Sequence, residues 1–241
     1  YLGGTKLVVS DVVESLSFTG TINQLGQDID GESADDAFGM SVSMNGDGTI
    51  VAIGTGWNDG NGVAAGHVRI YQYDSGNDIW NQLGEDIDGE ASLDYSGKSV
   101  SLSSDGTIVA IAAYMNEGTT TSNAGHVRVY QYDGTDWNQL GQDIDGEAKN
   151  DFSGDSVSIN DSGTIVAIGA TGNNGNGNNS GHVRIYQYDS GNDIWNQLGQ
   201  DIDGEAAGDY SGYSVSMNGD GTIVAIGAYY NDGTTTSNAG H

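Results

Sequence analysis

Residues 98–114 read KSVSLSSDGTIVAIAAY, and this short stretch decides the fold. In its first half, apolar Val100 and Leu102 alternate with serines, a pattern that is typical of a β-strand. The Asp-Gly pair at Asp105 and Gly106 then predicts a hairpin turn. The continuous apolar run that follows, TIVAI, is rich in β-branched residues, as expected for a strand that is covered on both faces. The stretch therefore predicts a tight antiparallel hairpin.

This hairpin pattern occurs four times along the chain, and its second strand supplies the residues that we expect in the core. No segment shows helical spacing of apolar residues, so the chain is predicted to be all-β. The expected core residues are Val51, Ile53, Val109, Ile111, Val166, Ile168, Val224 and Ile226.

The hairpins belong to a longer repeat of about 58 residues. Each repeat opens with NQLGQDIDGE, or with Glu in place of the second Gln, and continues with the hairpin, an alternating strand such as HVRIYQY at residues 67–73, and a fourth strand that runs into the next NQLG. Four antiparallel strands per repeat are typical of β-propeller blades. We therefore predict an all-β propeller, preceded by a β-prone segment at residues 1–22. Its four blades are 23–80, 81–137, 138–195 and 196–241, the last one incomplete.

The fourth repeat contains only the first two of its strands. Because an unpaired apolar strand edge promotes aggregation, we expect a further strand to cover it. Residues 6–22 could supply the missing strands and close the ring within one chain, which is the arrangement we favour. The same segment could instead pair with a neighbouring molecule and form a fibre, or the natural chain could continue beyond residue 241.

The charge balance is strongly acidic, with 34 Asp and Glu against 6 Lys and Arg and a formal net charge of −28. Such a surface repels phosphate backbones, which excludes nucleic acid as a partner. No apolar stretch reaches the length of a membrane helix, so we expect no membrane insertion. Self-repulsion at this charge destabilises a compact chain unless salt screens it or cations bind. A salty, calcium-containing exterior would provide both, although the acids could also serve only to keep the protein soluble.

Each repeat carries Asp-Ile-Asp-Gly-Glu and then a further Asp, which places four carboxylates close together. Calcium takes about six to eight oxygen ligands from flexible acidic loops, and glycine permits the tight bend. We therefore predict calcium at these segments, although Asp and Gly are also ordinary turn residues whose acids face water. The candidate ligands are Asp28, Asp30, Glu32, Asp36, Asp86, Asp88, Glu90, Asp94, Asp143, Asp145, Glu147, Asp151, Asp201, Asp203, Glu205 and Asp209.

Residues 35–56, DDAFGMSVSMNGDGTIVAIGTG, resemble the FG-GAP repeat of integrin α-subunit propellers and of many secreted microbial proteins. Phe38 and Gly39 form a literal Phe-Gly, whereas the other repeats have Ser-Gly at this point. The Gly-Ala of the second element occurs at residues 169–170 and 227–228, and the chain contains no proline. The resemblance implies a propeller with a role in extracellular binding or adhesion, and it specifies no ligand.

The resemblance also points to the hairpin loop NGDG at residues 45–48, because calcium-binding FG-GAP repeats have Asp-x-Asn/Asp-x-Asp-Gly there. Here Ser43 occupies the first ligand position, and Ser162 replaces the loop aspartate in the third repeat. A turn tolerates these exchanges, whereas a metal site loses ligands. We therefore interpret these loops as turns.

A histidine recurs at the start of each third strand, followed in three repeats by an arginine. Equivalent points on neighbouring blades are too far apart to share a metal, except close to the axis. We therefore interpret the histidines as strand-start residues, hydrogen-bonded or solvated, and the arginines as buried partners of local carboxylates. The residues are His67, His126, His182, His241, Arg69, Arg128 and Arg184.

The loops between the second and third strands vary most from one repeat to the next, and variable surface loops are natural contact regions. Trp57, Tyr114, Tyr229 and Tyr230 offer stacking surfaces there and are weak candidates for ligand binding. Packing between blades would explain these four aromatic residues equally well.

Nothing in the sequence resembles a nucleophile with its base, a phosphate-binding loop or a zinc motif. The similarity of the blades also argues against an active site, which normally needs one blade to differ. We therefore predict a noncatalytic extracellular or cell-surface module, stabilised by calcium, that mediates adhesion or binds an extracellular protein or glycan. The alternative is a structural protein whose copies build a filament, a sheath or a surface layer.

Overall fold

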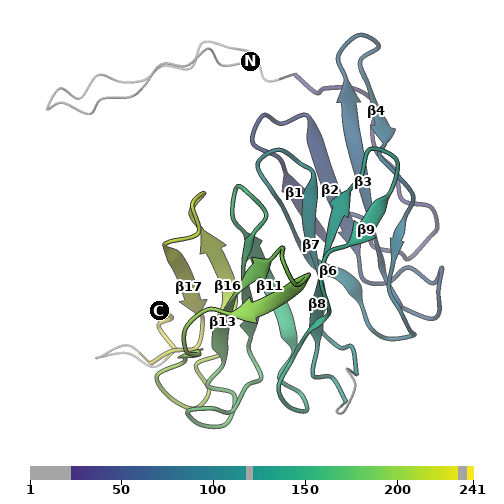
Figure 1. The fold of residues 1–241 in the computed structure, drawn as a ribbon. Helices are drawn as coiled ribbons and strands as arrows, with labels where there is room; N and C mark the ends of the chain where they lie inside the picture. Colours follow the sequence, from purple (N-terminus) through teal and green to yellow (C-terminus); the bar gives the residue numbers. More distant parts are fainter. Residues whose placement is uncertain (1–22, 118–121, 233–237) are drawn as a thin grey trace, which may run out of the picture.

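The computed structural model of the chain describes residues 23–117, 122–232 and 238–241. In these residues every regular element is a β-strand, and the strands form antiparallel sheets that lie side by side (Figure 1). This part of the chain contains no helix that could span a membrane. The predicted all-β fold is confirmed.

The first sheet shows the plan of a blade. Its strands β1 (Ser41–Met44), β2 (Ile50–Thr55), β3 (His67–Asp74) and β4 (Ile79–Gln82) lie in chain order, and β5 (Ile87–Asp88) pairs with the start of β3. β4 and β5 therefore lie along the same edge of β3 and form one fourth strand that is interrupted between them.

The later sheets repeat this plan. The second contains β6 (Ser96–Leu102), β7 (Ile108–Ala113), β8 (His126–Tyr132), β9 (Trp137–Gln139) and β10 (Ile144–Asp145). The third contains β11 (Ser153–Ile159), β12 (Ile165–Ala170), β13 (His182–Asp189), β14 (Ile194–Gln197) and β15 (Ile202–Asp203). The fourth contains β16 (Ser211–Met217) and β17 (Val224–Ala228).

The boundaries of the sequence repeats do not coincide with the boundaries of the sheets. The divisions after residues 80, 137 and 195 fall inside β4, β9 and β14, which belong to the preceding sheet. A repeat counted from NQLG thus combines the end of one blade with the first three strands of the next. Each acidic segment consequently lies where one blade passes into the following one.

The hydrophobic cores lie between the sheets. Ile50, Ala52, Val68 and Ile70 of the first sheet pack against residues of the second that include Val109. The opposite face of the second sheet, with Ile108 and Ala110, packs against the third. β7 is therefore covered on both faces, which confirms the reading of its continuous apolar run. Stacking of sheets face to face in this way is the packing of a propeller.

The predicted core is confirmed in the second and third sheets, where Val109, Ile111, Val166 and Ile168 are buried. Ile53 of the first sheet is also buried. The prediction is wrong for Val51, Val224 and Ile226, which are only half-buried. Val51 lies on the face of the first sheet that no other described sheet covers, and the other two lie in the two-stranded fourth sheet.

Serine side chains connect the first strands of neighbouring sheets. The Oγ of Ser43 accepts a hydrogen bond from the Leu102 backbone amide at 2.9 Å, and Ser101 accepts one from Ile159 at 3.0 Å. Ser158 accepts one from Met217, also at 3.0 Å. The serines that alternate with apolar residues are therefore contacts between blades and not simply a solvated face.

A β-bulge at the start of the first strand explains the recurring glycine of the Ser-Gly pair. The register of β6 against β7 shifts between Ser96 and Ser99, and Gly97 between them has a φ of 85°. Its carbonyl faces Gly54 of the preceding blade so closely that a Cβ on Gly54 would collide with it. Glycine at both positions lets the blades approach each other.

Residues 1–22 lie outside the described part of the chain, and so does the predicted closing strand. Whether residues 6–22 pair with the fourth sheet, with another copy or with neither stays a prediction.

Candidate functional site

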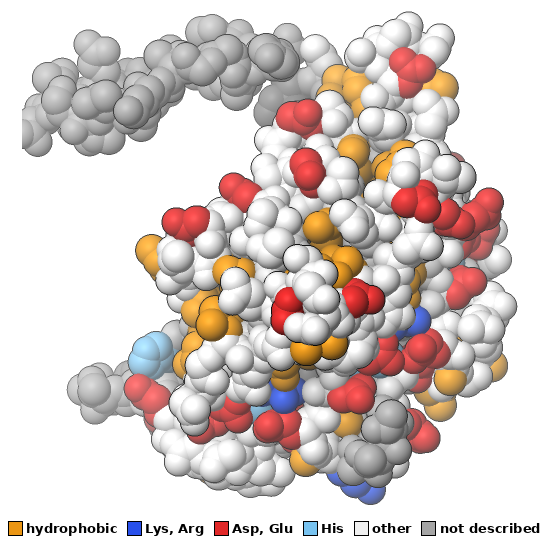
Figure 2. Space-filling view, viewed as in Figure 1, with side chains coloured by type: hydrophobic (Ala, Val, Ile, Leu, Met, Phe, Trp, Pro, Cys, Tyr) orange, Lys and Arg blue, Asp and Glu red, His pale blue; other side chains and the backbone are white. Residues whose placement is uncertain are grey.

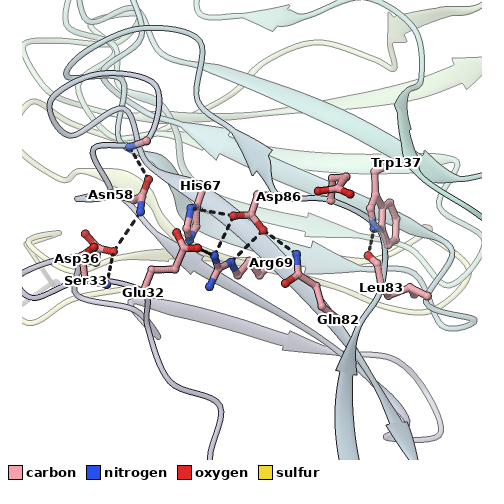
Figure 3. Close-up of polar contacts among 12 residues, drawn as sticks. Glu32, Ser33, Asp36, Asn58, His67, Arg69, Gln82, Leu83, Asp86 and Trp137 are labelled. Atoms are coloured by element: carbon pink, nitrogen blue, oxygen red, sulfur yellow. Dashed lines mark hydrogen bonds and ion pairs between the residues drawn. The ribbon is translucent and has the colours of Figure 1, made fainter.

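Histidine and arginine side chains at the start of each third strand meet carboxylates from two different acidic segments. In the first sheet, His67 and Arg69 of β3 lie between Glu32, from the segment before the sheet, and Asp86, from the segment that closes it (Figure 3). We call each such set of Glu, His, Arg and Asp a blade cluster. The antiparallel pairing of β5 with the start of β3 brings the second acidic segment back to the histidine.

Arginine supplies the positive charge in the first blade cluster. The Nε and Nη2 atoms of Arg69 donate to the two carboxylate oxygens of Asp86 at 2.9 and 3.0 Å, and Arg69 also forms an ion pair with Glu32. Gln82 donates a further hydrogen bond to Asp86 at 2.7 Å (Figure 3). These contacts lower the pKa of Asp86 against the opposing effect of burial, which is the largest single influence on it.

The arginines of the second and third clusters are arranged more loosely. Arg128 lies 3.4 Å from Glu90, and Arg184 lies 3.5 Å from Glu147. Each guanidinium also donates to a backbone carbonyl of the preceding acidic segment, at 2.9 Å for Arg128 and 2.8 Å for Arg184. The expected burial of the arginines beside local carboxylates is confirmed.

His67, His126 and His182 are buried at the first position of their strands and are not solvated, whereas His241 is exposed and lies outside the strands. The Nδ1 atom of His126 lies 3.9 Å from both Glu90 and Asp143, and that of His182 lies 3.8 Å from Asp201. Burial lowers the pKa of all three strand histidines, and for His126 it lowers the pKa to about 4. Neutral imidazoles thus lie beside carboxylates, a grouping that the spacing of the histidines in the sequence does not predict.

The fourth carboxylate of every acidic segment holds its own loop. Asp94 accepts hydrogen bonds from the Ala91 amide and the Asn116 side chain, both at 3.0 Å. Asp36, Asp151 and Asp209 make the equivalent contacts with a backbone amide and an asparagine, and all four are buried. Burial raises the pKa of Asp94. These four predicted calcium ligands have internal partners that account for them.

The remaining predicted ligands are distributed unevenly. Asp88 and Asp145 stand at the ends of β5 and β10, and burial raises the pKa of both. Asp28 and Asp30 are exposed, and Asp28 accepts a hydrogen bond from Gln24. Asp203 ends β15 of the third sheet, and Glu205 follows it and lies 3.7 Å from His241.

A cavity of about 600 Å³ lies over the second blade cluster. It is lined by Glu90, Asp94, Glu117, His126 and Asp143, together with Asp145 and three further residues. Figure 2 shows that carboxylate side chains are spread over the visible face of the molecule. The negative potential of such a cavity favours cations and repels anionic ligands.

The hairpin loops are turns closed by their own side chains, as interpreted. The Asn45 side-chain oxygen accepts hydrogen bonds from the amides of Thr49 and Ile50, both at 2.9 Å. Asp47 accepts from the amide and hydroxyl of Thr49. The loops of the other blades have related contacts, in which Ser103 takes the place of Asn45 in the second.

Two of the predicted stacking residues, Trp57 and Tyr114, contact aromatic residues that precede the next sheets, at one end of the sheets. Trp57 lies 5.2 Å from Tyr95, Tyr95 lies 5.8 Å from Tyr114, and Tyr114 lies 6.1 Å from Phe152, measured between ring centroids. We call these four residues the aromatic row. Because Tyr95 and Phe152 precede the first strands of the second and third sheets, the row also packs blades together.

Tyr229 and Tyr230 form a second group with Tyr210 and Tyr213 at the equivalent place on the fourth blade. The centroids of Tyr229 and Tyr230 are 4.3 Å apart, and Tyr213 lies 4.4 Å from Tyr229. We call this group the tyrosine cluster. Both groups keep solvent-exposed surface, with 48% exposure for Trp57 and 46% for Tyr230.

The family model for the FG-GAP repeat matches residues 29–71 and 202–241. These two segments are FG-GAP repeats. In the structure, each match begins in an acidic segment and runs into the following blade, which agrees with the offset between repeats and sheets. The first match therefore includes Glu32, His67 and Arg69 of the first blade cluster, whereas Asp86 lies beyond it. A comparison with curated protein sequences found no match.

Solved structures with similar folds are distant in sequence from this chain. It is similar to a candidate 6-phosphogluconolactonase from Bacteroides uniformis, with a TM-score of 0.51 and 12% identity over 82% of this chain. It is also similar to the hydrazine synthase of Kuenenia stuttgartiensis, with a TM-score of 0.48 and 12% identity over 87% of this chain. The chain spans about half the length of these proteins, 51% and 47%. The first likeness supports the propeller fold and carries nothing about function.

Proposed function

We propose that this FG-GAP propeller is a noncatalytic extracellular module for adhesion or ligand binding, and that its partner docks on the aromatic row and the tyrosine cluster. The observation that carries the proposal is the partial exposure of these rings at one end of the sheets, while their other surfaces are fixed by contact with neighbouring blades. Tyrosine and tryptophan provide large, rigid contact area at low entropic cost.

The charge of the protein narrows the class of partner. A formal net charge of −28 repels anionic glycans and acidic proteins. The proposed partner is therefore a neutral glycan or a basic protein surface. The recurrence of the same residue types in all three blade clusters supports a noncatalytic role, because an active site normally requires one blade to carry different residues.

Binding to a glycan array and to immobilised basic proteins tests this proposal. We expect Trp57→Ala and the double variant Tyr229→Ala/Tyr230→Ala to lose binding while the far-ultraviolet circular dichroism spectrum stays that of the parent. Ile79→Ala, which alters an exposed apolar residue on β4, is the control. Undiminished binding by the aromatic variants would overturn the proposed surface.

Calcium stabilisation is part of the same proposal and is supported by the excess of negative charge and by exposed carboxylates of the acidic segments such as Asp28 and Asp30. Calcium that binds only the folded state raises the melting temperature by mass action. We therefore expect the melting temperature to rise when millimolar CaCl₂ is added and to return to its starting value after addition of a chelator. A melting temperature that does not change with CaCl₂ would show that calcium does not stabilise the protein.

A structural role is the second candidate, and the chemistry of two sheet faces favours it. In the described residues, Val42 and Met44 are 65% and 59% exposed on one face of the first sheet, and Ile223 is 67% exposed on the fourth. Ser216 of the fourth sheet is exposed at the position where Ser43 and Ser101 bind the next blade. The fourth sheet of one copy could thus pack on the first sheet of another, a head-to-tail contact that extends into filaments.

Light scattering over a range of concentrations tests this alternative. We expect the average mass to rise with concentration and Val42→Asp to reduce the rise, whereas Val63→Asp, at an exposed loop position, leaves it unchanged. A constant monomer mass at every concentration would contradict the structural role.

A further inference from the structure

The side chain of His182 is buried without a hydrogen-bond partner. The residue is 1% exposed, and neither ring nitrogen is hydrogen-bonded within the described residues. Burying a polar group without a partner costs free energy, so native proteins pair almost all such groups. An unmatched imidazole inside a fold therefore requires an explanation.

The nearest polar atoms are placed as metal ligands would be. The Nδ1 atom of His182 lies 3.8 Å from Oδ2 of Asp201, which is too far for a hydrogen bond. Two atoms that bind one tetrahedral zinc ion at about 2.0–2.1 Å lie roughly 3.4 Å apart, so a shift of a few tenths of an ångström brings this pair to the spacing of metal ligands. Glu147 offers the third atom, and all three ligand atoms lie within 4.8 Å of one another.

One carboxylate of this set is held in orientation by a hydrogen bond, and the other has room to move toward a bound ion. Gln197 donates a hydrogen bond to Oδ1 of Asp201 at 2.6 Å, so the other oxygen, Oδ2, remains toward the histidine. Partners of this kind orient metal ligands in proteins. The side chain of Glu147 is 45% exposed, which leaves it room to close the last few tenths of an ångström.

We propose that Glu147, His182 and Asp201 bind a divalent transition-metal ion of the zinc type. One imidazole nitrogen and two carboxylate oxygens suit zinc, whereas calcium and magnesium prefer oxygen ligands alone. A neutral imidazole is the form of histidine that binds metal. The two carboxylates balance the charge of the ion beside Arg184, whose ion pair is with Glu147.

All three blades place Glu, His and Asp ligand atoms within 4.8 Å of one another, but only the second and third leave the Asp free of a bidentate arginine. Glu90, His126 and Asp143 have the same arrangement, and Gln139 donates to Asp143 at 2.7 Å. In the first blade, Arg69 donates to both oxygens of Asp86, so a guanidinium already occupies the place of the ion. We therefore expect about two zinc ions per chain of 241 residues.

Isothermal titration of the full, chelator-treated chain with ZnCl₂, and optical titration with Co²⁺, test the proposal. We expect about two sites, one fewer in His182→Gln, and none in the double variant His126→Gln/His182→Gln. Co²⁺ should give the visible absorption of a low-coordinate nitrogen and oxygen site. Asp201→Asn, which keeps the size of the side chain, should weaken the same site if His182→Gln folds poorly.

His241→Gln is the matched control, because His241 also lies beside a glutamate but its side chain is 64% exposed. Equal loss of zinc in this control and in His182→Gln would show adventitious surface binding and overturn the proposal. Full competition by an equal concentration of CaCl₂, or two sites retained in the double variant, would also overturn it.

Discussion

At the scale of single residues, carboxylates that look alike in the sequence have different environments. In the second repeat, Asp86 pairs with an arginine, Asp94 closes a buried loop, and Asp88 lines an acidic surface where burial raises its pKa. The sequence pattern groups these residues because their spacing is the same in every repeat. Their chemistry follows from which strand each one meets, so one metal hypothesis cannot cover all of them.

Asp151 gives the clearest test of a structural carboxylate. It is 1% exposed and accepts hydrogen bonds from the Ala148 amide at 3.0 Å and the Asn173 side chain at 3.1 Å. Asp151→Ala leaves two buried donors without a partner, which we expect to lower the free energy of unfolding by about 1–3 kcal/mol. Urea denaturation measures the loss, with exposed Glu85→Ala as the control. Equal stability of the two variants would contradict this role.

The buried side chain of Tyr130 should make the folded protein less stable at alkaline pH. Its side chain lies in the core between the first two sheets, and burial raises its pKa to about 12. Between its ordinary pKa of about 10 and that value, the unfolded chain has lost the proton that the folded protein retains. Stability therefore falls as the pH rises through this window, by up to about 3 kcal/mol for this group.

The comparison of Tyr130→Phe with the parent isolates this effect from the other tyrosines. We expect the difference in unfolding free energy between the two proteins to shift in favour of the variant from about pH 9 to about pH 11.5. A difference that stays constant across this range would show that Tyr130 does not titrate in the window.

At the scale of elements, the first strand of a blade can contact both neighbouring blades, through its apolar positions on one face and its serines on the other. Its apolar residues pack into the core against the preceding sheet, while its serine hydroxyls accept hydrogen bonds from the first strand of the next. The interrupted fourth strand has a related role, because the indole of Trp137 donates to the Leu83 carbonyl of the preceding blade at 2.8 Å (Figure 3). Blade contacts are thus specific and not only hydrophobic.

Ser101 and Ser216 occupy the same position in two blades and form a matched pair for a test. Ser101 accepts the amide of Ile159, which is buried, whereas Ser216 is exposed on the fourth sheet. We expect Ser101→Ala to lower the unfolding free energy by about 1–2 kcal/mol and Ser216→Ala to leave it nearly unchanged. If both substitutions lower the unfolding free energy by the same amount, the hydrogen bond between blades is not the reason that Ser101 stabilises the protein.

At the scale of the whole molecule, a large negative charge surrounds cores that are buried between sheets. The formal charge of −28 is distributed over all the repeats, and the few arginines are engaged in the blade clusters. Repulsion between these charges opposes the compact state, and mobile ions weaken this repulsion.

The response to salt tests this balance. Raising NaCl from about 0.01 to 0.1 M shortens the screening length from about 30 to 10 Å. We expect the melting temperature to rise over this range in the absence of divalent ions, with choline chloride giving the same rise because the effect is one of ionic strength. A melting temperature that falls with salt would mean that ion pairs such as Arg69–Asp86 outweigh the repulsion.

The sequence by itself determined the all-β class, the hairpins, the turn loops and the propeller plan, because these depend on local alternation, turn residues and the repeat. Residues 98–114 were sufficient for the hairpin, since side-chain direction alternates along any strand. Tertiary structure alone decided the half-burial of Val51 and Val224, the contacts of the serines between blades, and the grouping of His182 with Glu147 and Asp201. Each of these features depends on how residues of different sheets or different repeats lie relative to one another. Local spacing carries no information about such distances, because they are set only when the blades pack together.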